Sequence, residues 1–258
     1  MKILFIGDTV ARPGRNCVRT HLGRVQEEFA VDFTILNCEN ADDGFGVTPP
    51  IARELFSMGI DVLTSGNHIW DKKEILDYLD TEDRILRPAN YPPGNPGHGH
   101  VVAESRAGEP VGVVNIQGRV FMPTIDDPFR GVDAELDAIP DTVRVIFVDM
   151  HAEATAEKVA MGWYLDGRAS ALVGTHTHIP TADERILPGG LAYQTDAGMT
   201  GPFDSVIGMT RETTMERFHR QVPVRFAVAS QGAEFNATFI EVDSTTGKAL
   251  RIERIHRQ

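Results

Sequence analysis

Cysteine is scarce in this chain, and its scarcity limits how the fold is held together. The 258 residues contain two cysteines, Cys17 and Cys38. Two thiols cannot supply a disulfide framework, and free thiols are typical of proteins of the reducing cytosol. A chain of this length buries enough apolar surface to fold without covalent staples. We therefore expect a cytoplasmic protein.

Long apolar runs and net positive charge are also missing. The first ten residues, MKILFIGDTV, hold a short apolar run before Asp8, and no stretch approaches the length of a transmembrane helix. We therefore expect neither a signal peptide nor a membrane partner. Lysine and arginine number 25 against 37 aspartates and glutamates, which gives a formal net charge of -12. Because polynucleotide binders use broad basic faces, no stable nucleic-acid partner is predicted.

Short apolar runs alternate with helix-like segments along most of the chain, and this rhythm predicts an α/β fold with strands buried on both faces. The expected strands are 2–7, 33–38, 61–66, 144–150 and 170–175, and the expected helices are 15–29, 48–56, 71–79 and 153–165. Residues 86–100, dense in proline and glycine, predict a surface loop. Pro-Gly-Gly and Thr-Thr-Gly turns further along predict a second sheet of more antiparallel character. No linker or repeat interrupts the chain, and one domain over 1–258 is expected.

Side chains that can bind metals or transfer protons follow five of the predicted strands. They are Asp8, Glu39 with Asn40, Asn67 with His68, His151, and His176 with His178. Ligands of α/β sheets bind beyond the carboxyl ends of the strands, so we expect these side chains to converge. In extended backbone, a spacing of two places His176 and His178 on the same side.

The candidate ligands are oxygen and nitrogen atoms, and no thiolate is among them. Such a set suits Fe, Mn or Zn and disfavours sulfur-rich structural zinc sites. Six or seven groups are too many for one tetrahedral ion and suit two, with Glu39 as the best bridging carboxylate. Two bridged ions would lie ~3.5 Å apart. Their charge exceeds that of Asp8 and Glu39, which predicts a phosphoryl substrate despite the acidic exterior.

The order of these motifs resembles the signature of the calcineurin-like metallophosphoesterases. Gly7-Asp8, Gly66-Asn67-His68, His151 and Gly174-Thr175-His176-Thr177-His178 follow the order of that signature over about two thirds of the chain. The chain departs from the signature at two places. Val10 replaces an expected histidine, and Glu39 followed by Asn40 replaces the usual bridging aspartate. Both departures are similar to a bacterial subgroup of 2′,3′-cyclic nucleotide phosphodiesterases.

The resemblance implies a four-layer αββα sandwich with two central mixed sheets. It also implies two metal ions, the first held by Asp8, Glu39, Asn40 and His178 and the second by Glu39, Asn67, His151 and His176. In this subgroup the amide of Asn40 fills the ligand position vacated at Val10. His68 would lie outside both ligand sets and face the leaving group. Loss of an imidazole hardens the first ligand set and favours Fe or Mn, with Zn possible.

The expected reaction is the hydrolysis of a small phosphodiester. A hydroxide held between two cations forms near neutral pH and attacks phosphorus in line with the departing oxygen. His68 would donate a proton to the leaving alkoxide, which contributes ~10²–10⁴-fold to the rate. The resemblance implies small cyclic nucleotides of the 2′,3′-cyclic AMP or GMP type as substrates. Two alternatives stay open, namely a phosphatase or phosphodiesterase of phosphoproteins or RNA, and a non-catalytic metal-dependent nucleotide sensor. A homo-oligomer would suit such a compact enzyme.

Several residues near the motifs admit two interpretations. Arg12 either contacts a phosphate or is solvated. Asp71 either orients His68 or begins a helix, and its position favours the helix. Phe121 and Met122 either fill the core or stack on a nucleobase. Residues 42–47 predict a loop over the site, and they lack the lysine of a phosphate-binding P-loop.

Overall fold

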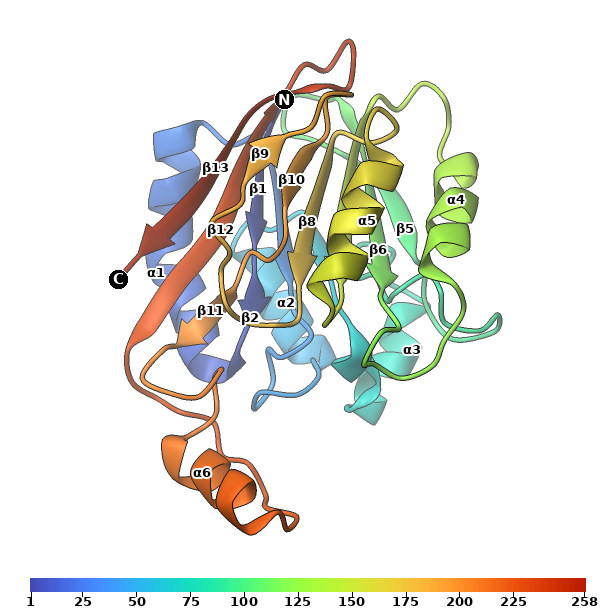
Figure 1. Cartoon of the computed structure of the whole chain (residues 1–258). Coiled ribbons are helices and arrows are strands. Elements are labelled where there is room, and N and C mark those ends of the chain that lie inside the picture. Colours follow the sequence, from blue (N-terminus) through green and yellow to red (C-terminus); the bar gives the residue numbers. More distant parts are fainter.

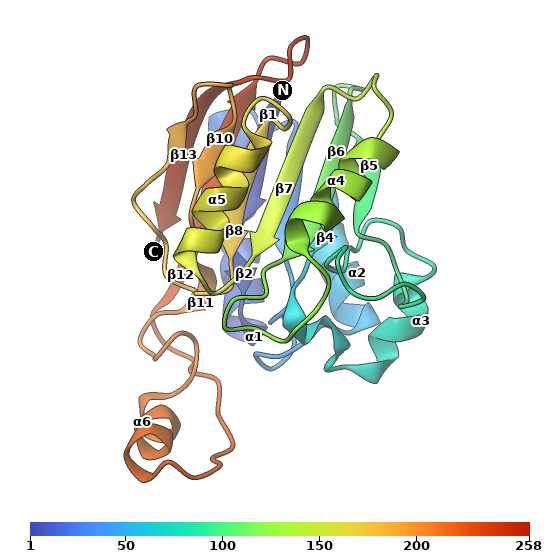
Figure 2. The ribbon, with the colours of Figure 1, turned by 45° about the vertical axis from the view of Figure 1, so that its right-hand side comes forward.

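The computed structural model describes residues 1–258 as four layers (Figures 1 and 2). Two mixed β-sheets pack face to face. Helices α1 (Ala11–Phe29) and α2 (Pro49–Ser57) cover the first sheet, and α4 (Pro128–Ala138) and α5 (Thr155–Leu165) cover the second. This arrangement confirms the predicted αββα sandwich. None of the helices combines the length and apolar character that crossing a bilayer requires.

The first sheet contains seven strands in mixed directions. Its order is β2-β11-β12-β1-β3-β4, with β13 beside β12. The strands are β1 (Lys2–Ile6), β2 (Asp8–Thr9), β3 (Phe33–Asn37), β4 (Val62–Thr64), β11 (Met199–Pro202), β12 (Ala233–Val242) and β13 (Ala249–Arg257). Strand β1 is parallel to β3 and antiparallel to β12.

The C-terminal hairpin corrects one expectation from the sequence. Strands β12 and β13 are joined by the Thr-Thr-Gly turn, as predicted, but they extend the first sheet and do not build a second one. The physical reason is that β1 needs a partner on this edge. Without β12, the backbone N–H and C=O groups along that edge of β1 would have no hydrogen-bond partner.

The second sheet contains six strands in the order β5-β6-β7-β8-β10-β9. Its strands are β5 (His100–Glu104), β6 (Pro110–Gln117), β7 (Val145–His151), β8 (Ala171–Thr175), β9 (Arg185–Ile186) and β10 (Ala192–Gln194). The four inner strands are parallel, and β5 and β9 are antiparallel edge strands. The Pro-Gly-Gly turn therefore connects two strands of this sheet.

Buried apolar side chains fill the space between the two sheets. Successive residues of β1 point to opposite faces, so Ile3 and Phe5 meet the second sheet while Leu4 and Ile6 meet the first layer of helices. The rings of Phe5 and Phe147 lie with their centroids 4.8 Å apart. Each inner strand is consequently buried on both faces, as its continuous apolar run predicts.

One expected helix is wrong, and two helices were not predicted. Residues 71–79 do not form a single helix; the chain makes η1 (Asn67–Trp70), η2 (Lys73–Ile75) and α3 (Leu76–Leu79). Lys72 interrupts the helical path because it is extended and its Nζ lies 3.0 Å from Asp42. Helix α4 was not predicted, and it is capped by Asp127, whose side chain accepts hydrogen bonds from the backbone of Phe129 and Arg130.

The second unpredicted helix, α6 (Arg211–Arg220), lies in residues 203–231 between β11 and β12. We call these residues the α6 segment. In Figures 1 and 2 the segment projects from the end of the molecule toward which the arrowheads of β1, β7 and β8 point. The two legs of the segment are joined, because Thr210 N donates to Ala227 O at 2.7 Å and Met209 pairs with Val228.

Candidate metal centre

The seven expected ligand residues meet where the carboxyl ends of both sheets come together. Asp8, Glu39, Asn40 and Asn67 follow strands of the first sheet, and His151, His176 and His178 end or follow strands of the second. Two groups of ligand atoms have all their members within 4.8 Å of one another. The first group is Glu39, His151 and His176, and the second is Asp8, Glu39 and His178. Glu39 belongs to both groups.

The first group centres on the imidazole of His151. Its Nε2 lies 3.1 Å from Glu39 Oε1, 3.1 Å from Asn67 Oδ1 and 3.0 Å from His176 Nδ1. The side chains of His151 and Glu39 are 0% and 1% exposed. One buried carboxylate, one amide oxygen and two imidazoles thus point their acceptor atoms at a common place.

The second group surrounds Asp8, which is fully buried. His178 Nε2 lies 3.9 Å from Asp8 Oδ1, and Asn40 Nδ2 donates to His178 Nε2 at 3.1 Å. A half-turn of the Asn40 amide would present its oxygen at the same place, since amide N and O are interchangeable in shape. Val10 lies in a small apolar cluster with Met199 and offers no polar atom.

Hydrogen bonds outside the two groups fix the orientation of two imidazoles. His151 Nδ1 donates to Thr175 Oγ1 at 2.9 Å, and that hydroxyl donates to Asp149 Oδ1 at 2.7 Å. His178 Nδ1 donates to the carbonyl of Ile207 at 2.8 Å. In both rings Nδ1 is engaged by these acceptors, which leaves Nε2 facing the ligand groups.

The backbone of the loop with His176 and His178 is not extended, so the expected geometry of this pair is wrong. The φ angles of His176 and His178 are 97° and 67°, in the left-handed region that side chains disfavour. Both rings still face the site, but they do so from a turn beyond the end of β8 at Thr175. Asp196 holds this turn by accepting hydrogen bonds from Thr177 N and Thr177 Oγ1 at 3.2 and 2.8 Å.

A buried lysine completes the support of the loop. Lys158 Nζ lies 2.7 Å from Asp196 Oδ2 and donates to the carbonyl of Thr175 at 2.7 Å. The side chains of Lys158 and Asp196 are 0% and 1% exposed. Buried charges require such pairing, because each alone would lose its hydration without compensation.

The charges of the site fit a bound cation. Burial raises the pKa of Asp8, and Asp8 Oδ1 is a buried atom that has no hydrogen-bond partner in the protein. Burial also opposes the charges of Glu39 and His151, but their mutual attraction lowers the pKa of Glu39 and raises that of His151. Burial and the neighbouring His151 lower the pKa of His176 to about 3, so this ring is a neutral donor. Orphaned carboxylate oxygen and neutral imidazole are suitable ligands for Fe, Mn or Zn.

His68 lies beside the two groups and belongs to neither. Its backbone N–H donates to Glu39 Oε2 at 3.2 Å, and its ring packs edge-on against Phe45 at 4.9 Å. Asp71 does not begin a helix, contrary to the favoured expectation. It follows η1, where the chain turns back, and its Oδ2 lies 2.8 Å from His68 Nδ1.

A cavity of about 380 Å³ opens over the ligand groups. Its lining includes Glu39, His68, His176 and His178 from the site, Gly44 and Phe45 from the expected loop, and residues of the α6 segment. Phe121 and Met122 are not part of this lining; Phe121 is 88% exposed, and Met122 packs against the core beside α4 and α5. Neither ring nor thioether therefore reaches the site.

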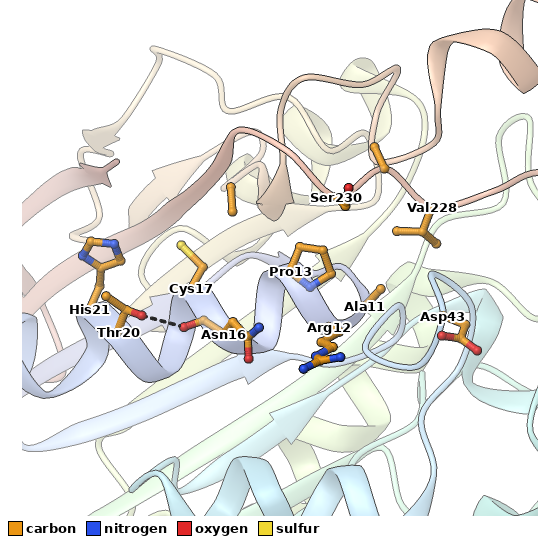
Figure 3. Close-up of a pocket in the computed structure, with 12 residues that line it drawn as sticks. Ala11, Arg12, Pro13, Asn16, Cys17, Thr20, His21, Asp43, Val228 and Ser230 are labelled. Carbon is orange, nitrogen blue, oxygen red and sulfur yellow. Dashed lines mark hydrogen bonds between the residues drawn. The ribbon is translucent and has the colours of Figure 1, made fainter.

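Arg12 lies in a different groove, shown in Figure 3. This groove, of about 560 Å³, runs between the first turns of α1 and residues 228–233. Arg12, Asn16 and His21 line it from α1, and none of them lines the cavity over the ligand groups. Arg12 is consequently not placed to contact a phosphate there.

Five residues that orient the ligand side chains were not expected from the sequence. They are Asp149, Lys158, Thr175, Asp196 and Ile207. Asp149 has a readable signal, because it precedes His151 by two residues on one strand and so faces the same side. Burial raises its pKa to about 6, against hydrogen bonds from Thr64, Thr175 and Asn37. Ile207 acts through its carbonyl, and a backbone atom leaves no signal in the sequence.

Comparison with known proteins gives consistent matches over the whole chain. A 2′,3′-cyclic-nucleotide 2′-phosphodiesterase of Bacillus subtilis is 49% identical over 255 residues, which cover 99% of this chain and 96% of the relative. A hypothetical protein of Thermus thermophilus has a crystal structure that matches with a TM-score of 0.93 and 43% identity, over 100% of this chain and 99% of that one. A crystal structure described as a novel phosphatase of Mycoplasma pneumoniae matches with a TM-score of 0.93 and 34% identity, over 100% and 93%.

The family model that matches the chain is described as YmdB-like protein, and the match runs from residue 4 to residue 255. These matches confirm the resemblance to metallophosphoesterases of the cyclic nucleotide phosphodiesterase subgroup that the ordered motifs indicate. The chain belongs to the YmdB-like protein family.

Proposed function

We propose that this protein is a metal-dependent phosphoric diester hydrolase that acts on 2′,3′-cyclic nucleotides of the AMP or GMP type. The observation that carries this proposal is the pair of ligand groups that share Glu39 beneath a cavity of about 380 Å³. A cavity of this size suits a small ligand. The name of the Bacillus relative supports the choice of a cyclic nucleotide.

Two metal ions fit the donor atoms. Asp8, Glu39, Asn40 and His178 would hold the first ion, and Glu39, Asn67, His151 and His176 would hold the second. The oxygen-rich first set favours Fe or Mn, and Zn is also compatible. When bound, such ions supply a water of lowered pKa and neutralise negative charge on phosphorus.

The residues of the chain itself supply the proton and the alignment. His68 lines the cavity outside the ligand groups, where its ring can donate a proton to the leaving alkoxide of the ribose. Asp71 holds the other nitrogen of that ring at 2.8 Å and thereby fixes its direction. Donation by a positioned acid contributes ~10²–10⁴-fold to the rate.

We further propose that residues 1–258 act as one domain in the cytoplasm. The family match over residues 4–255 supports one domain. Two buried free thiols, Cys17 and Cys38, support a reducing compartment.

Substitution of His68 by alanine tests the catalytic role. We expect the turnover of adenosine 2′,3′-cyclic phosphate to fall by ~10²–10⁴-fold while two metal ions per chain are retained, as measured by elemental analysis. Asp8→Ala is the contrasting variant, and it should lose metal as well as turnover. If His68→Ala left the turnover unchanged, the proton-donor role would be wrong. If the unaltered protein bound adenosine 2′,3′-cyclic phosphate without turnover, a nucleotide-sensing protein would be the better description.

A second candidate function is a phosphatase, because the Mycoplasma structure is described as one. Phosphomonoesters, cyclic nucleotides and short RNAs should be compared as substrates in the presence of Mn²⁺. We expect kcat/KM to be highest for the cyclic nucleotides. A preference for monoesters would replace the proposed reaction with phosphomonoester hydrolysis.

A further inference from the structure

The α6 segment contributes one wall of the cavity over the ligand groups. The lining residues from this segment are Val206, Ile207, Met209, Thr214, Arg217, Phe218 and Phe226. The proposed hydrolysis assigns a task only to Ile207, whose carbonyl orients His178. An apolar surface with one cation thus lies next to the metal-ligating side chains without a role in the chemistry.

Two phenyl rings of this wall are open to solvent. Phe218 is 63% exposed and Phe226 is 39% exposed. The third ring of the cavity, Phe45, packs against His68, whereas the aromatic pairs of the structure include neither Phe218 nor Phe226. Apolar surface left in water is unfavourable, and covering it releases free energy. A flat apolar ligand would therefore gain free energy by covering these rings.

The two legs of the segment are joined at the base of the wall, and the bond between His178 and Ile207 attaches this base to the site. Ala229 N donates to Gly208 O at 2.9 Å, and Gly208 N donates to Ser205 Oγ at 2.8 Å. Together with the bond from His178 Nδ1 to Ile207 O, these contacts fix the start and the end of the segment beside the site. The rings are consequently part of the same cavity as His176 and His178.

The charge of the wall is complementary to a phosphodiester. Arg217 is the one lysine or arginine in the lining, and no salt bridge of the structure engages it. The acidic side chains of the lining, Glu39 and Glu153, lie within 3.3 Å of His151 or His176. An anionic ligand in the cavity would meet the guanidinium of Arg217 as its free partner.

We infer that the α6 segment is the nucleoside subsite, in which Phe218 and Phe226 stack against the nucleobase and Arg217 faces the phosphate. This inference rests on the proposed function and makes it more specific. A cyclic nucleotide has an anionic end and a flat aromatic end, and the cavity offers ligand groups for the first and open rings for the second. Stacking on an aromatic side chain tolerates any base, so the subsite accepts adenine and guanine alike.

Two substrates that share the reacting ring separate the contribution of the base. Adenosine 2′,3′-cyclic phosphate and glycerol 1,2-cyclic phosphate both carry a five-membered cyclic phosphodiester, and only the first carries a base. We expect Phe218→Ala and Phe226→Ala each to lower the ratio of kcat/KM between the first and second substrates by about tenfold, through KM. Arg217→Gln should lower kcat/KM for both substrates by a similar factor of about two to five.

Met215→Ala is the matched control. Met215 lies on α6 and is 46% exposed, but it does not line the cavity. This variant should leave the ratio between the two substrates unchanged. An unchanged ratio in Phe218→Ala and Phe226→Ala would overturn the inference. If kcat/KM fell equally for both substrates, the rings would have a structural role. Loss of self-association with an unchanged ratio would assign the rings to a contact between copies of the chain.

A binding measurement distinguishes this inference from the proposed function. The affinities for adenosine 2′-monophosphate and glycerol phosphate should be measured by titration calorimetry. Suppose that neither cyclic ester is hydrolysed, but Phe218→Ala lowers the affinity for adenosine 2′-monophosphate and not that for glycerol phosphate. The proposed function then fails and the subsite stands. If both esters are hydrolysed and Phe218→Ala alters neither ratio nor affinity, the function stands and the subsite is wrong.

Discussion

At the scale of single residues, Gly66 shows how little space the site leaves. A Cβ atom at this position would lie 2.2 Å from the ring of His151 and 2.3 Å from Glu39 Oε2. Both atoms belong to buried groups that cannot retreat. The glycine before Asn67 and His68 therefore permits the close approach of the backbone to the ligand atoms.

We predict that Gly66→Ala weakens metal binding. The added methyl group displaces Glu39 and His151 together, and elemental analysis should find fewer than two ions per chain with turnover lowered by at least ~100-fold. Gly23→Ala is the control, because nothing lies within 4 Å of its added Cβ in α1. It should keep metal and raise the free energy of unfolding by about 0.5–1 kcal/mol.

The hydroxyl of Thr175 relays the orientation of His151 to Asp149. Thr175→Val removes the acceptor of His151 Nδ1–H and a donor to Asp149 while conserving shape. We expect metal affinity or turnover to fall by ~10–100-fold, measured by competition with a chelator and by kinetics. Thr175→Ser retains the hydroxyl and should restore most of the loss. Equal defects in both variants would contradict the relay.

At the scale of elements, the turn after β8 depends on partners that are distant in sequence. Lys158 on α5 and Asp196 after β10 hold it through the carbonyl of Thr175 and the backbone of Thr177. These contacts stabilise the left-handed conformations of His176 and His178. The geometry of this turn is thus set by contacts with α5 and with the residues after β10, and not by the sequence of the turn alone.

We predict that Lys158→Met lowers the free energy of unfolding by about 3–5 kcal/mol, because it leaves Asp196 buried without its cation. Urea denaturation should measure the change. The double variant Lys158→Met with Asp196→Asn removes both charges and should recover part of the loss. A single variant as stable as the unaltered protein would show that the pair contributes nothing.

The sequence predicts the elements well where a strand is buried on both faces. Apolar runs identified β1, β3, β4, β7 and β8, and the polar residues at their ends marked the site. The predictions from the sequence were wrong where contacts between residues distant in the chain determine the local backbone conformation. Lys72 breaks the expected helix through Asp42, and the turn at His176 follows from Asp196. Helix α6 carries few buried residues, so its apolar periodicity was too weak to recognise.

At the scale of the whole molecule, the thiol of Cys17 links stability to pH. Burial and, secondarily, the charge of Glu234 raise its pKa to about 11. In the unfolded chain a thiol titrates near about 8.5. The thiol of Cys17 therefore keeps its proton to a higher pH in the folded state than in the unfolded chain. The contribution of this thiol to stability is complete below pH ~8.5 and is lost as the pH rises toward 11.

We predict that the free energy of unfolding declines between pH 8.5 and pH 11 more steeply in the unaltered protein than in Cys17→Ala. Urea denaturation at several pH values measures both slopes. Iodoacetamide at pH 8 should label the native thiols slowly and the denatured thiols rapidly, because burial keeps them protonated. Parallel slopes in the two proteins would contradict the raised pKa.

The pairing of β1 with β12 has a consequence for biosynthesis. Lys2 pairs with Glu241, so one edge of β1 has no partner until nearly the entire chain has been translated. At roughly 5–20 residues per second, the ribosome delivers that partner on the order of ten to fifty seconds later. Throughout this interval an apolar strand edge is available to other nascent chains. The strand order of the first sheet therefore predicts that the nascent chain needs protection by chaperones during translation.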